Sequence, residues 1–177
     1  MAKILAFAGS NSSTSINYKL VKYTVSLIQN HETRLLNMAN YPFPLYSEDL
    51  ERKEGYSNSL VELKNDIQKM DALIISVNEH NGNPSAYFKN LLDWLSRLER
   101  KFLLGKKVLL ISTSRGKGGG KGALGVTEKL VPRFGAEVVA TFSMPSFAEN
   151  FDNSGKIVTQ ELADQHRAAL DKFLEIL

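Results

Sequence analysis

The sequence contains no cysteine. Disulfide bridges, zinc sites with thiolate ligands and catalysis by a thiolate nucleophile are therefore excluded, and the composition suits a reducing compartment. Histidine is scarce as well, and His31, His80 and His166 have no spacing to carboxylates that predicts a metal site. We expect structural roles for His31 and His166, and no metal.

Long apolar runs are missing too. The apolar stretch that begins at Ile4 ends by Ala8, which is too short for the core of a signal peptide or for a membrane span. We therefore expect a cytoplasmic protein with no membrane association. The chain has 177 residues, of which 43% are hydrophobic, and residues 1–177 are predicted to form a single domain around one core.

The net charge is only +3, but basic residues are concentrated in one part of the chain. A site for an anionic ligand explains such a cluster, and so does an ordinary solvated surface. Aromatic residues are not interleaved with the basic ones, so a nucleic-acid partner is not expected. The cluster, in which Glu99 is the acidic residue, consists of Arg97, Arg100, Lys101, Lys106, Lys107, Arg115, Lys117 and Lys121.

Short apolar segments alternate with amphipathic helical patterns, which predicts a doubly wound α/β fold with a parallel sheet and helices on both faces. The segments are apolar at odd and even positions, as is typical of strands buried on two faces. Ligands of such sheets bind beyond the carboxyl ends of the strands, here in the loops after the first, third and fourth strands when the edge strand is counted as the second. The predicted strands are Lys3–Ala8, Asp71–Val77, Lys107–Ser112 and Glu137–Ser143, with an edge strand at Thr33–Met38.

The loop after the first strand, residues 9–17, consists almost entirely of small polar residues. Ser15 is predicted to cap a helix that starts at Ile16, which leaves backbone N–H groups at the helix start free to bind an anion. The hydroxyls of Ser10 and Ser12 could donate further hydrogen bonds to a phosphate. An ordinary serine-rich turn remains the alternative.

Residues that this loop lacks exclude other phosphate chemistries on a similar sheet. A phospho-receiver domain would need acidic residues where the first strand ends in Ala8, Gly9 and Ser10. A P-loop would need Gly-Lys followed by Ser or Thr, and none follows the first strand.

The loop after the third strand adds a second motif, and the two motifs together resemble the signature of the NADPH-dependent FMN reductase family. That family includes flavin, quinone, chromate and azo-dye reductases. The resemblance implies a flavodoxin-like three-layer sandwich with a five-stranded parallel sheet of order 2-1-3-4-5, and bound FMN that NADPH or NADH reduces. The matching residues are Gly9, Ser10, Ser15, Asn17, Glu79, Asn81, Gly82, Pro84, Lys89, Asn90, Asp93 and Trp94.

The resemblance also assigns residues to the cofactor. No catalytic residue is expected, because the flavin itself would carry the hydride chemistry. The phosphate would be bound by Ser10, Ser12, Ser15 and Asn17, with the N–H of Ile16 at the helix start. The flavin ring would lie against Asn78, Glu79, His80, Asn81 and Gly82, with Ser114 and Gly116 in the third loop.

Two positions depart from the family pattern. Ser12 stands where many members have an arginine, which removes a charge that would pair with the phosphate. His80 stands where many members have a tyrosine, so a titratable imidazole replaces an aromatic ring beside the flavin. Weaker FMN binding and an altered acceptor preference are the expected consequences.

The loop after the fourth strand, "STSRGKGGGKGALG", is the most glycine-dense part of the sequence. Gly118, Gly120 and Ala123 match the dinucleotide-binding fingerprint, but that fingerprint should open the first βαβ unit, so we disfavour it. We expect a flexible loop close to the flavin, in which Lys117 and Lys121 meet the phosphates of the nicotinamide nucleotide.

These observations predict an NAD(P)H-dependent FMN oxidoreductase that passes hydride through FMN to a small acceptor: free flavin, a quinone, an azo compound or a metal oxyanion. The alternatives are a flavodoxin-type electron carrier, which is typically acidic while this chain has a pI near 9.0, and a scaffold without cofactor. The aromatic segment Asn40–Ser57 is predicted to form part of the acceptor site or a subunit contact. The resemblance further implies a homodimer or homotetramer.

Overall fold

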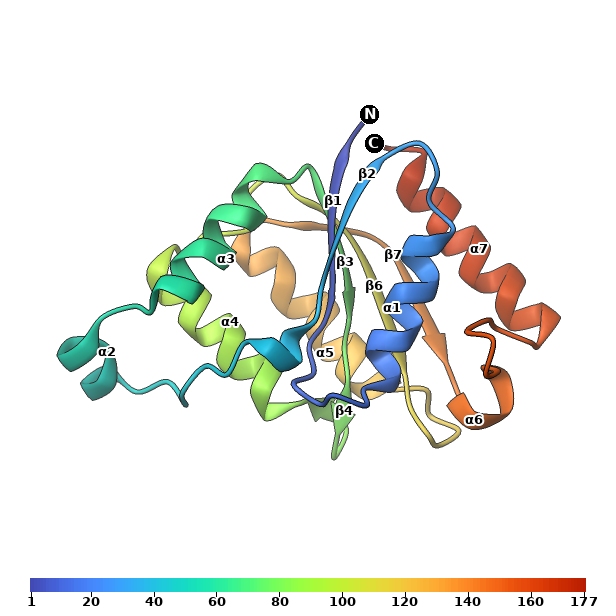
Figure 1. The fold of residues 1–177 in the computed structure, drawn as a ribbon, viewed down its shortest axis with the longest axis horizontal. Coiled ribbons are helices and arrows are strands. Elements are labelled where there is room, and N and C mark those ends of the chain that lie inside the picture. Colours follow the sequence, from blue (N-terminus) through green and yellow to red (C-terminus); the bar gives the residue numbers. More distant parts are fainter.

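The centre of the computed structural model, which describes residues 1–177, is a parallel sheet (Figure 1). Its strands are β1 (Lys3–Ala8), β2 (Glu32–Leu36), β3 (Ala72–Ser76), β6 (Lys107–Thr113) and β7 (Glu137–Met144). They lie in the order β2-β1-β3-β6-β7, and every neighbouring pair is parallel. The two intervening short strands form a separate hairpin, so this order is the predicted 2-1-3-4-5. The flavodoxin-like fold is confirmed.

Strand β1 shows why the sheet strands are continuous apolar runs in the sequence. Leu5 and Phe7 pack into the core on one face of the sheet, whereas Ile4 and Ala6 pack into the core on the other. Because successive side chains of a strand point to opposite faces, a strand covered on both sides is apolar at every position.

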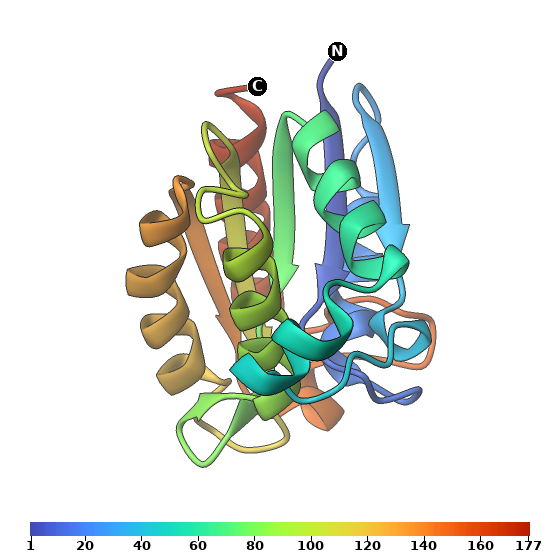
Figure 2. The same ribbon diagram turned by 90° about the vertical axis from the view of Figure 1, so that its left-hand side faces the viewer.

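Helices cover both faces of the sheet and complete three layers (Figure 2). α3 (Asn58–Lys69), α4 (Ala86–Leu98) and α5 (Lys121–Leu130) contribute to the core on one face, and α1 (Ile16–Ser26) and α7 (Gln160–Leu174) to the core on the other. No helix combines the length and the apolar character that crossing a bilayer requires. The short elements are β4 (Glu79–His80), β5 (Asn83–Pro84), α2 (Glu48–Glu54), α6 (Phe147–Asn150) and the 3₁₀ turns Met38–Asn40 and Val131–Phe134.

The segment between β2 and α3 differs from the prediction. β2 ends at Leu36 rather than Met38, because a 3₁₀ turn follows in which the Asn37 side chain accepts a backbone N–H at 3.1 Å. The aromatic segment Asn40–Ser57 contains a helix, α2, which begins after the capping residue Ser47 and has no buried residue. Acidic residues in its first turn and basic residues in its last complement the helix dipole. In Figure 1, α2 protrudes from the body of the molecule.

A buried polar contact joins α1 to α7. The hydroxyl of Thr24 donates to the carbonyl of Leu20 at 2.9 Å, so it accepts a hydrogen bond from Nε2 of His166, 2.8 Å away. The other ring nitrogen, Nδ1, is buried without a partner. Burial lowers the pKa of His166 to about 4, so the imidazole is neutral at neutral pH. His166 therefore has a packing role between two helices.

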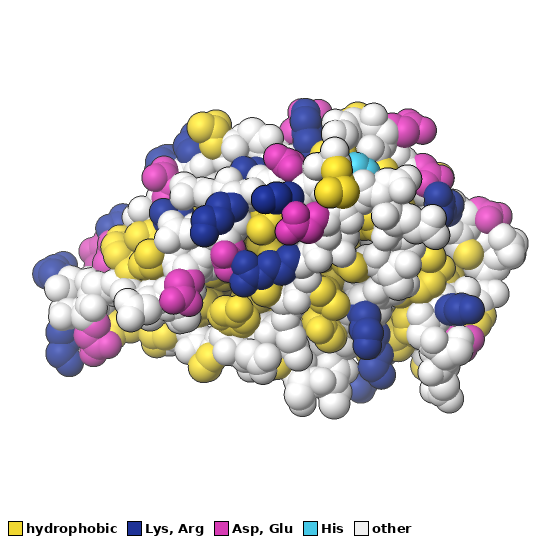
Figure 3. Space-filling model, turned by 45° about the horizontal axis from the view of Figure 1, so that its top comes forward, with side chains coloured by type: hydrophobic (Ala, Val, Ile, Leu, Met, Phe, Trp, Pro, Cys, Tyr) yellow, Lys and Arg dark blue, Asp and Glu magenta, His cyan; other side chains and the backbone are white.

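Basic and acidic side chains are mixed on the face that Figure 3 shows, at the end of the molecule that carries both termini. The basic cluster of the sequence is also divided in the structure. Members that bind carboxylates or carbonyls of the protein itself are Arg97, Lys101, Lys106 and Lys107. Members with no ion pair and no side-chain hydrogen bond are Arg100, Arg115, Lys117 and Lys121.

Candidate functional site

The loops after β1, β3 and β6 surround a cavity of about 440 Å³ at the carboxyl end of the sheet. Size alone does not single out this cavity, because one of about 500 Å³ lies between α1 and residues 147–155. The cavity formed by the three loops has a single hydrophobic residue, Ile16, in its wall. The lining residues are Ser10, Ser12, Thr14, Ser15, Ile16, Asn17, Asn78, Glu79, His80, Thr113, Ser114 and Arg115.

The start of α1 supplies the donors of this wall. Ser15 caps the helix as predicted, and its hydroxyl accepts the N–H of Tyr18 at 3.1 Å. The N–H groups of Ile16 and Asn17 have no acceptor within the chain. They carry the positive end of the helix dipole into the cavity, so an anionic group bound there would be stabilised.

The side chain of Asn17 has a different role from the one expected. It is buried, and its oxygen accepts hydrogen bonds from the Ser76 hydroxyl at 2.7 Å and from the N–H of Thr113 at 3.0 Å. Its amide donates to the carbonyl of Thr113 at 3.1 Å. Asn17 thus fixes the first turn of α1 to the ends of β3 and β6, and its backbone N–H remains for a ligand.

Another part of the cavity wall comes from Asn78 and from β4, the first strand of the hairpin of β4 and β5. Asn81 and Gly82 connect the two strands, and both have positive φ, at 52° and 73°. A two-residue turn of this kind matches the twist of a hairpin and favours Asn-Gly. Immediately before the hairpin, the side-chain oxygen of Asn78 is buried and has no hydrogen-bond partner. A ligand with an N–H at this position would satisfy it.

Glu79 does not direct its carboxylate only at the cavity. Its Oε2 accepts the N–H of Ala123 at 2.9 Å, in the first turn of α5. The N-cap residue of α5 is Gly120, which has no side chain, so the carboxylate of Glu79 supplies the cap from another element. Glu79 therefore joins the hairpin to α5.

Gly119, Gly120 and Gly122 of the glycine-rich third loop are closely packed, whereas a Cβ at Gly116 or Gly118 would have no neighbour within 4 Å. A Cβ at Gly119 would lie 2.4 Å from the Ser143 hydroxyl, and one at Gly120 would lie 2.0 Å from the Ser112 hydroxyl. A Cβ at Gly122 would lie 2.7 Å from the carbonyl oxygen of Gly82 in the hairpin. The glycines allow the loop to approach two strands and the hairpin closely.

Predicted site residues outside the cavity wall are Asn81, Gly82 and Gly116. The first two form the hairpin turn. The carbonyl of Gly116 accepts the N–H of Ser146 at 3.0 Å, which holds the third loop against the segment that leads into α6. These residues shape the backbone around the cavity.

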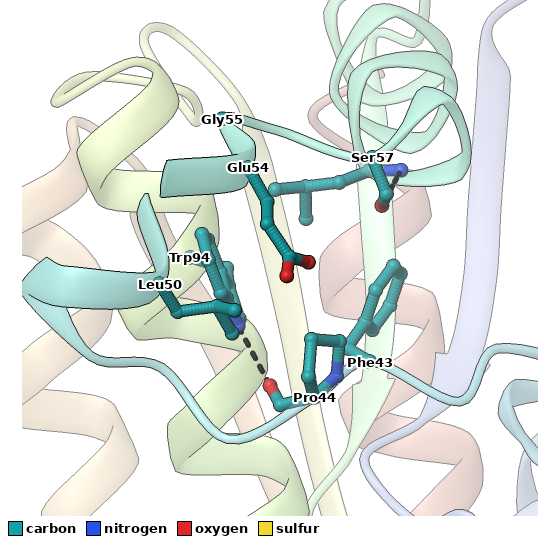
Figure 4. A pocket seen from close by; sticks show the side chains of 8 residues that line it. Phe43, Pro44, Leu50, Glu54, Gly55, Ser57 and Trp94 are labelled. Atoms are coloured by element: carbon teal, nitrogen blue, oxygen red, sulfur yellow. Dashed lines mark hydrogen bonds between the residues drawn. The ribbon is translucent and has the colours of Figure 1, made fainter. Parts of the chain in front are cut away.

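Two residues of the second motif anchor the aromatic segment 40–57 to α4. The side chain of Asn90 accepts the N–H of Tyr46 at 2.7 Å and donates to the carbonyl of Pro44 at 2.9 Å. The indole of Trp94 donates to the same carbonyl at 2.8 Å (Figure 4). Beside this contact, Glu54 points into a pocket of about 110 Å³ between Trp94 and Phe43 (Figure 4).

A second cluster fixes α2 to α4. The carboxylate of Glu51 accepts hydrogen bonds from the hydroxyls of Tyr46 and Tyr56 at 2.8 and 2.6 Å, and from Arg97 at 3.0 Å. These donors lower the pKa of Glu51, the Tyr56 hydroxyl most strongly. Sequence reasoning missed this cluster, because the segment carries no apolar periodicity that predicts where it packs.

The fold defines a flavodoxin-like protein, and a polar cavity lies at the carboxyl end of its sheet. The model of the NADPH-dependent FMN reductase family matches residues 2–150. The chain belongs to this family.

Individual relatives match over different lengths. Quinone reductase of Escherichia coli is 38% identical over 77 residues, which are 44% of this chain and 41% of that protein. The chain thus aligns with about two fifths of this curated relative. NAD(P)H-dependent FMN reductase PA1204 of Pseudomonas aeruginosa is 27% identical over 66% of this chain and 62% of its own. FerB, a flavoenzyme NAD(P)H:(acceptor) oxidoreductase from Paracoccus denitrificans, is similar in structure with a TM-score of 0.80, 25% identity and coverage of 99% and 96%.

Proposed function

We propose that the chain is an NAD(P)H-dependent FMN oxidoreductase that passes hydride through bound FMN to a small electron acceptor. The cavity at the carboxyl end of the sheet is the observation that carries this proposal. At one wall are the free N–H groups of Ile16 and Asn17, and at another is the unpartnered buried oxygen of Asn78. A phosphate fits the first wall, and the ring N–H of a flavin fits the second.

Different residues of the cavity would bind the phosphate and the ring of FMN. The start of α1 and the hydroxyls of Ser10, Ser12 and Thr14 bind the phosphate, and Asn78 and the hairpin backbone bind the pyrimidine edge of the ring. FMN supplies the capacity to accept a hydride from a nicotinamide and to pass reducing equivalents on. The chain has to bind and orient its ligands and needs no acid or base, so we assign no catalytic residue.

The relatives indicate which acceptor to test first. Two of them are named quinone reductase and NAD(P)H-dependent FMN reductase. A quinone and free flavin are therefore the first acceptors to compare, with NADPH and NADH as alternative reductants. His80, which is exposed at the cavity, is placed to affect the choice of acceptor.

Anaerobic titration tests the proposal. The purified protein is loaded with FMN, and the visible absorption of the flavin is followed as NADPH or NADH is added and then a quinone. We expect the absorption to bleach with one of the nucleotides and to return with the quinone. An FMN-loaded protein that neither nucleotide bleaches would instead be an electron carrier, and a protein that cannot bind FMN would overturn both functions.

We further propose that residues 1–177 act as one FMN-binding domain, that the protein works in the cytoplasm, and that it is a homodimer or homotetramer. The segment 40–57 supports the last point, because α2 buries none of its residues and Leu45 is 78% exposed. Figures 1 and 2 both place α2 toward the carboxyl end of the sheet, which is also the end that carries the cavity. Light scattering tests it: a monomer at micromolar concentration with full activity would contradict this assembly.

A further inference from the structure

The phosphate subsite has no cationic side chain of its own. Residues 9–17 contain neither lysine nor arginine, so the first loop offers only neutral donors. The carboxylate of Glu79 is the one acidic group in the cavity wall, and Arg115 is the one guanidinium or ammonium group there. A phosphomonoester carries a charge near −2 at neutral pH, so neutral donors leave much of it unpaired.

Arg115 is held beside the start of α1 by the residues around it. Thr113 exchanges two hydrogen bonds with the side chain of Asn17, at 3.0 and 3.1 Å. The carbonyls of Ser114 and Gly116 each accept a backbone N–H of the segment leading into α6, both at 3.0 Å. The backbone on each side of Arg115 is therefore anchored, and the residue lines the same cavity as Ser12 and Ser15.

The guanidinium of Arg115 is not engaged elsewhere. It makes no ion pair and no hydrogen bond within the chain, whereas Arg97 of the same basic cluster is paired with Glu51. Exposed, unpaired arginines are common on surfaces. This one differs because it lines a cavity that also presents two free N–H groups at a helix start.

We propose that Arg115 is the charged partner of the FMN phosphate and replaces, from the third loop, the cation that the first loop lacks. A guanidinium can donate two parallel hydrogen bonds to phosphate oxygens, which a lysine cannot reproduce. This inference rests on the proposed function, since it requires FMN in the cavity. It adds a residue that neither sequence motif contains.

Flavin binding tests the proposal without any turnover. Dissociation constants for FMN and for riboflavin, which has no phosphate, are measured by fluorescence quenching on the wild type, Arg115→Ala and Arg115→Lys. We expect Arg115→Ala to lose about thirtyfold in FMN affinity, as the loss of a charge-assisted hydrogen-bonded partner gives. Its riboflavin affinity should stay within twofold of the wild type, and Arg115→Lys should be intermediate for FMN.

Two further variants separate the local role from a general effect of charge. Arg100→Ala removes another exposed, unpaired cation of the basic cluster that does not line the cavity, and should leave FMN affinity unchanged. Ser12→Arg combined with Arg115→Ala returns a cation to the first loop, and should restore most of the lost FMN affinity. This rescue would show that the position of the charge at the phosphate matters, rather than the fold of the third loop.

Other outcomes would overturn the proposal in distinguishable ways. FMN affinity within twofold of the wild type in Arg115→Ala would refute it, even if the KM for NADPH rose and placed Arg115 at the nicotinamide nucleotide instead. Equal losses for FMN and riboflavin would show a structural role. A wild-type protein that binds neither flavin would overturn the proposed function itself, and the role of Arg115 with it.

Discussion

The first and third loops both bring small residues to the same edge of the sheet, but for opposite physical reasons. In the first loop, small polar residues leave donors free: the N–H groups of Ile16 and Asn17 have no partner in the chain. In the third loop, Gly119 and Gly120 fill space so closely that a Cβ would overlap with serine hydroxyls of two strands. The first loop keeps backbone donors for a ligand, whereas Gly119 and Gly120 of the third loop are packed against the protein itself.

The difference shows that a high glycine content does not by itself predict that a loop is flexible or that a ligand binds against it. A glycine can be required by a neighbour that lies far away in the sequence, as Gly120 is by Ser112. Arg115 combines the two features: its neighbouring backbone is anchored by hydrogen bonds, while its side chain has no partner in the protein. Three predictions test this contrast and a fourth, at His166, serves as a reference away from both loops; they follow from the largest effect to the smallest.

Gly120→Ala should give the largest loss of stability. The methyl group would meet the Ser112 hydroxyl at 2.0 Å, and φ at Gly120 is +77°, which disfavours an L residue. Overpacking and left-handed strain together predict a decrease of about 4 kcal/mol in the free energy of unfolding. Urea denaturation measures it. Gly118→Ala is the matched control, since nothing lies within 4 Å of its Cβ, and its effect should stay below about 1 kcal/mol.

Acid should lower the free energy of unfolding through His166, which packs between α1 and α7 and belongs to neither loop. The pKa of His166 is about 4 in the folded protein and about 6.5 when unfolded, so the unfolded state binds more protons between these pH values. The free energy of unfolding should therefore fall by about 3 kcal/mol as pH drops from 6.5 to 4, relative to His166→Gln. Urea denaturation at several pH values measures this difference. Parallel pH curves for the two proteins would contradict it.

Ser15→Asp should separate the capping role of the first loop from its ligand role. Aspartate caps a helix about as well as serine, so the melting temperature of the apo protein should not fall. Against a bound phosphate, the new carboxylate should reduce FMN affinity about a hundredfold, or about 2.7 kcal/mol, after screening.

Fluorescence titration with FMN and riboflavin checks the prediction for Ser15→Asp. Riboflavin serves as the control, because it lacks the phosphate and should bind the variant as it binds the wild type. Unchanged FMN affinity would mean that the first loop is a turn only. It would also remove the assignment of Ser10, Ser12 and the N–H of Asn17.

Glu79→Gln should give the smallest effect, and it tests the link between the hairpin and the third loop. Glutamine keeps an oxygen that can accept the N–H of Ala123 but removes the charge at the start of α5. The apo protein should lose about 1 kcal/mol, seen as a melting temperature lower by about 3 °C. An unchanged apo melting temperature with weaker flavin binding would show instead that Glu79 acts on the ligand alone.

Much of the fold could be predicted because it depends on local patterns. Residues 4–8 of β1 and 72–75 of β3 are all apolar, because both faces of the sheet are covered. Ser15 caps α1 by accepting the N–H of Tyr18, only three residues further along the chain. The Asn81-Gly82 turn is likewise specified by the two residues that form it. Two elements were not predicted correctly. β2 ends early, at a turn that a side chain caps, and α2 has a polar sequence without the apolar periodicity that predicts a helix.

The sequence by itself determined the parallel sheet, the capped and polar first loop and the family. Only the tertiary structure decided that the side chain of Asn17 fastens β3 and β6, that Glu79 caps α5, that Asn90 and Trp94 hold the carbonyl of Pro44, and that Arg115 lines the cavity. Each of these contacts joins residues of different elements. Local propensity and periodicity carry no information about such partners, because their proximity arises when the strands assemble in an order that differs from the order of the chain.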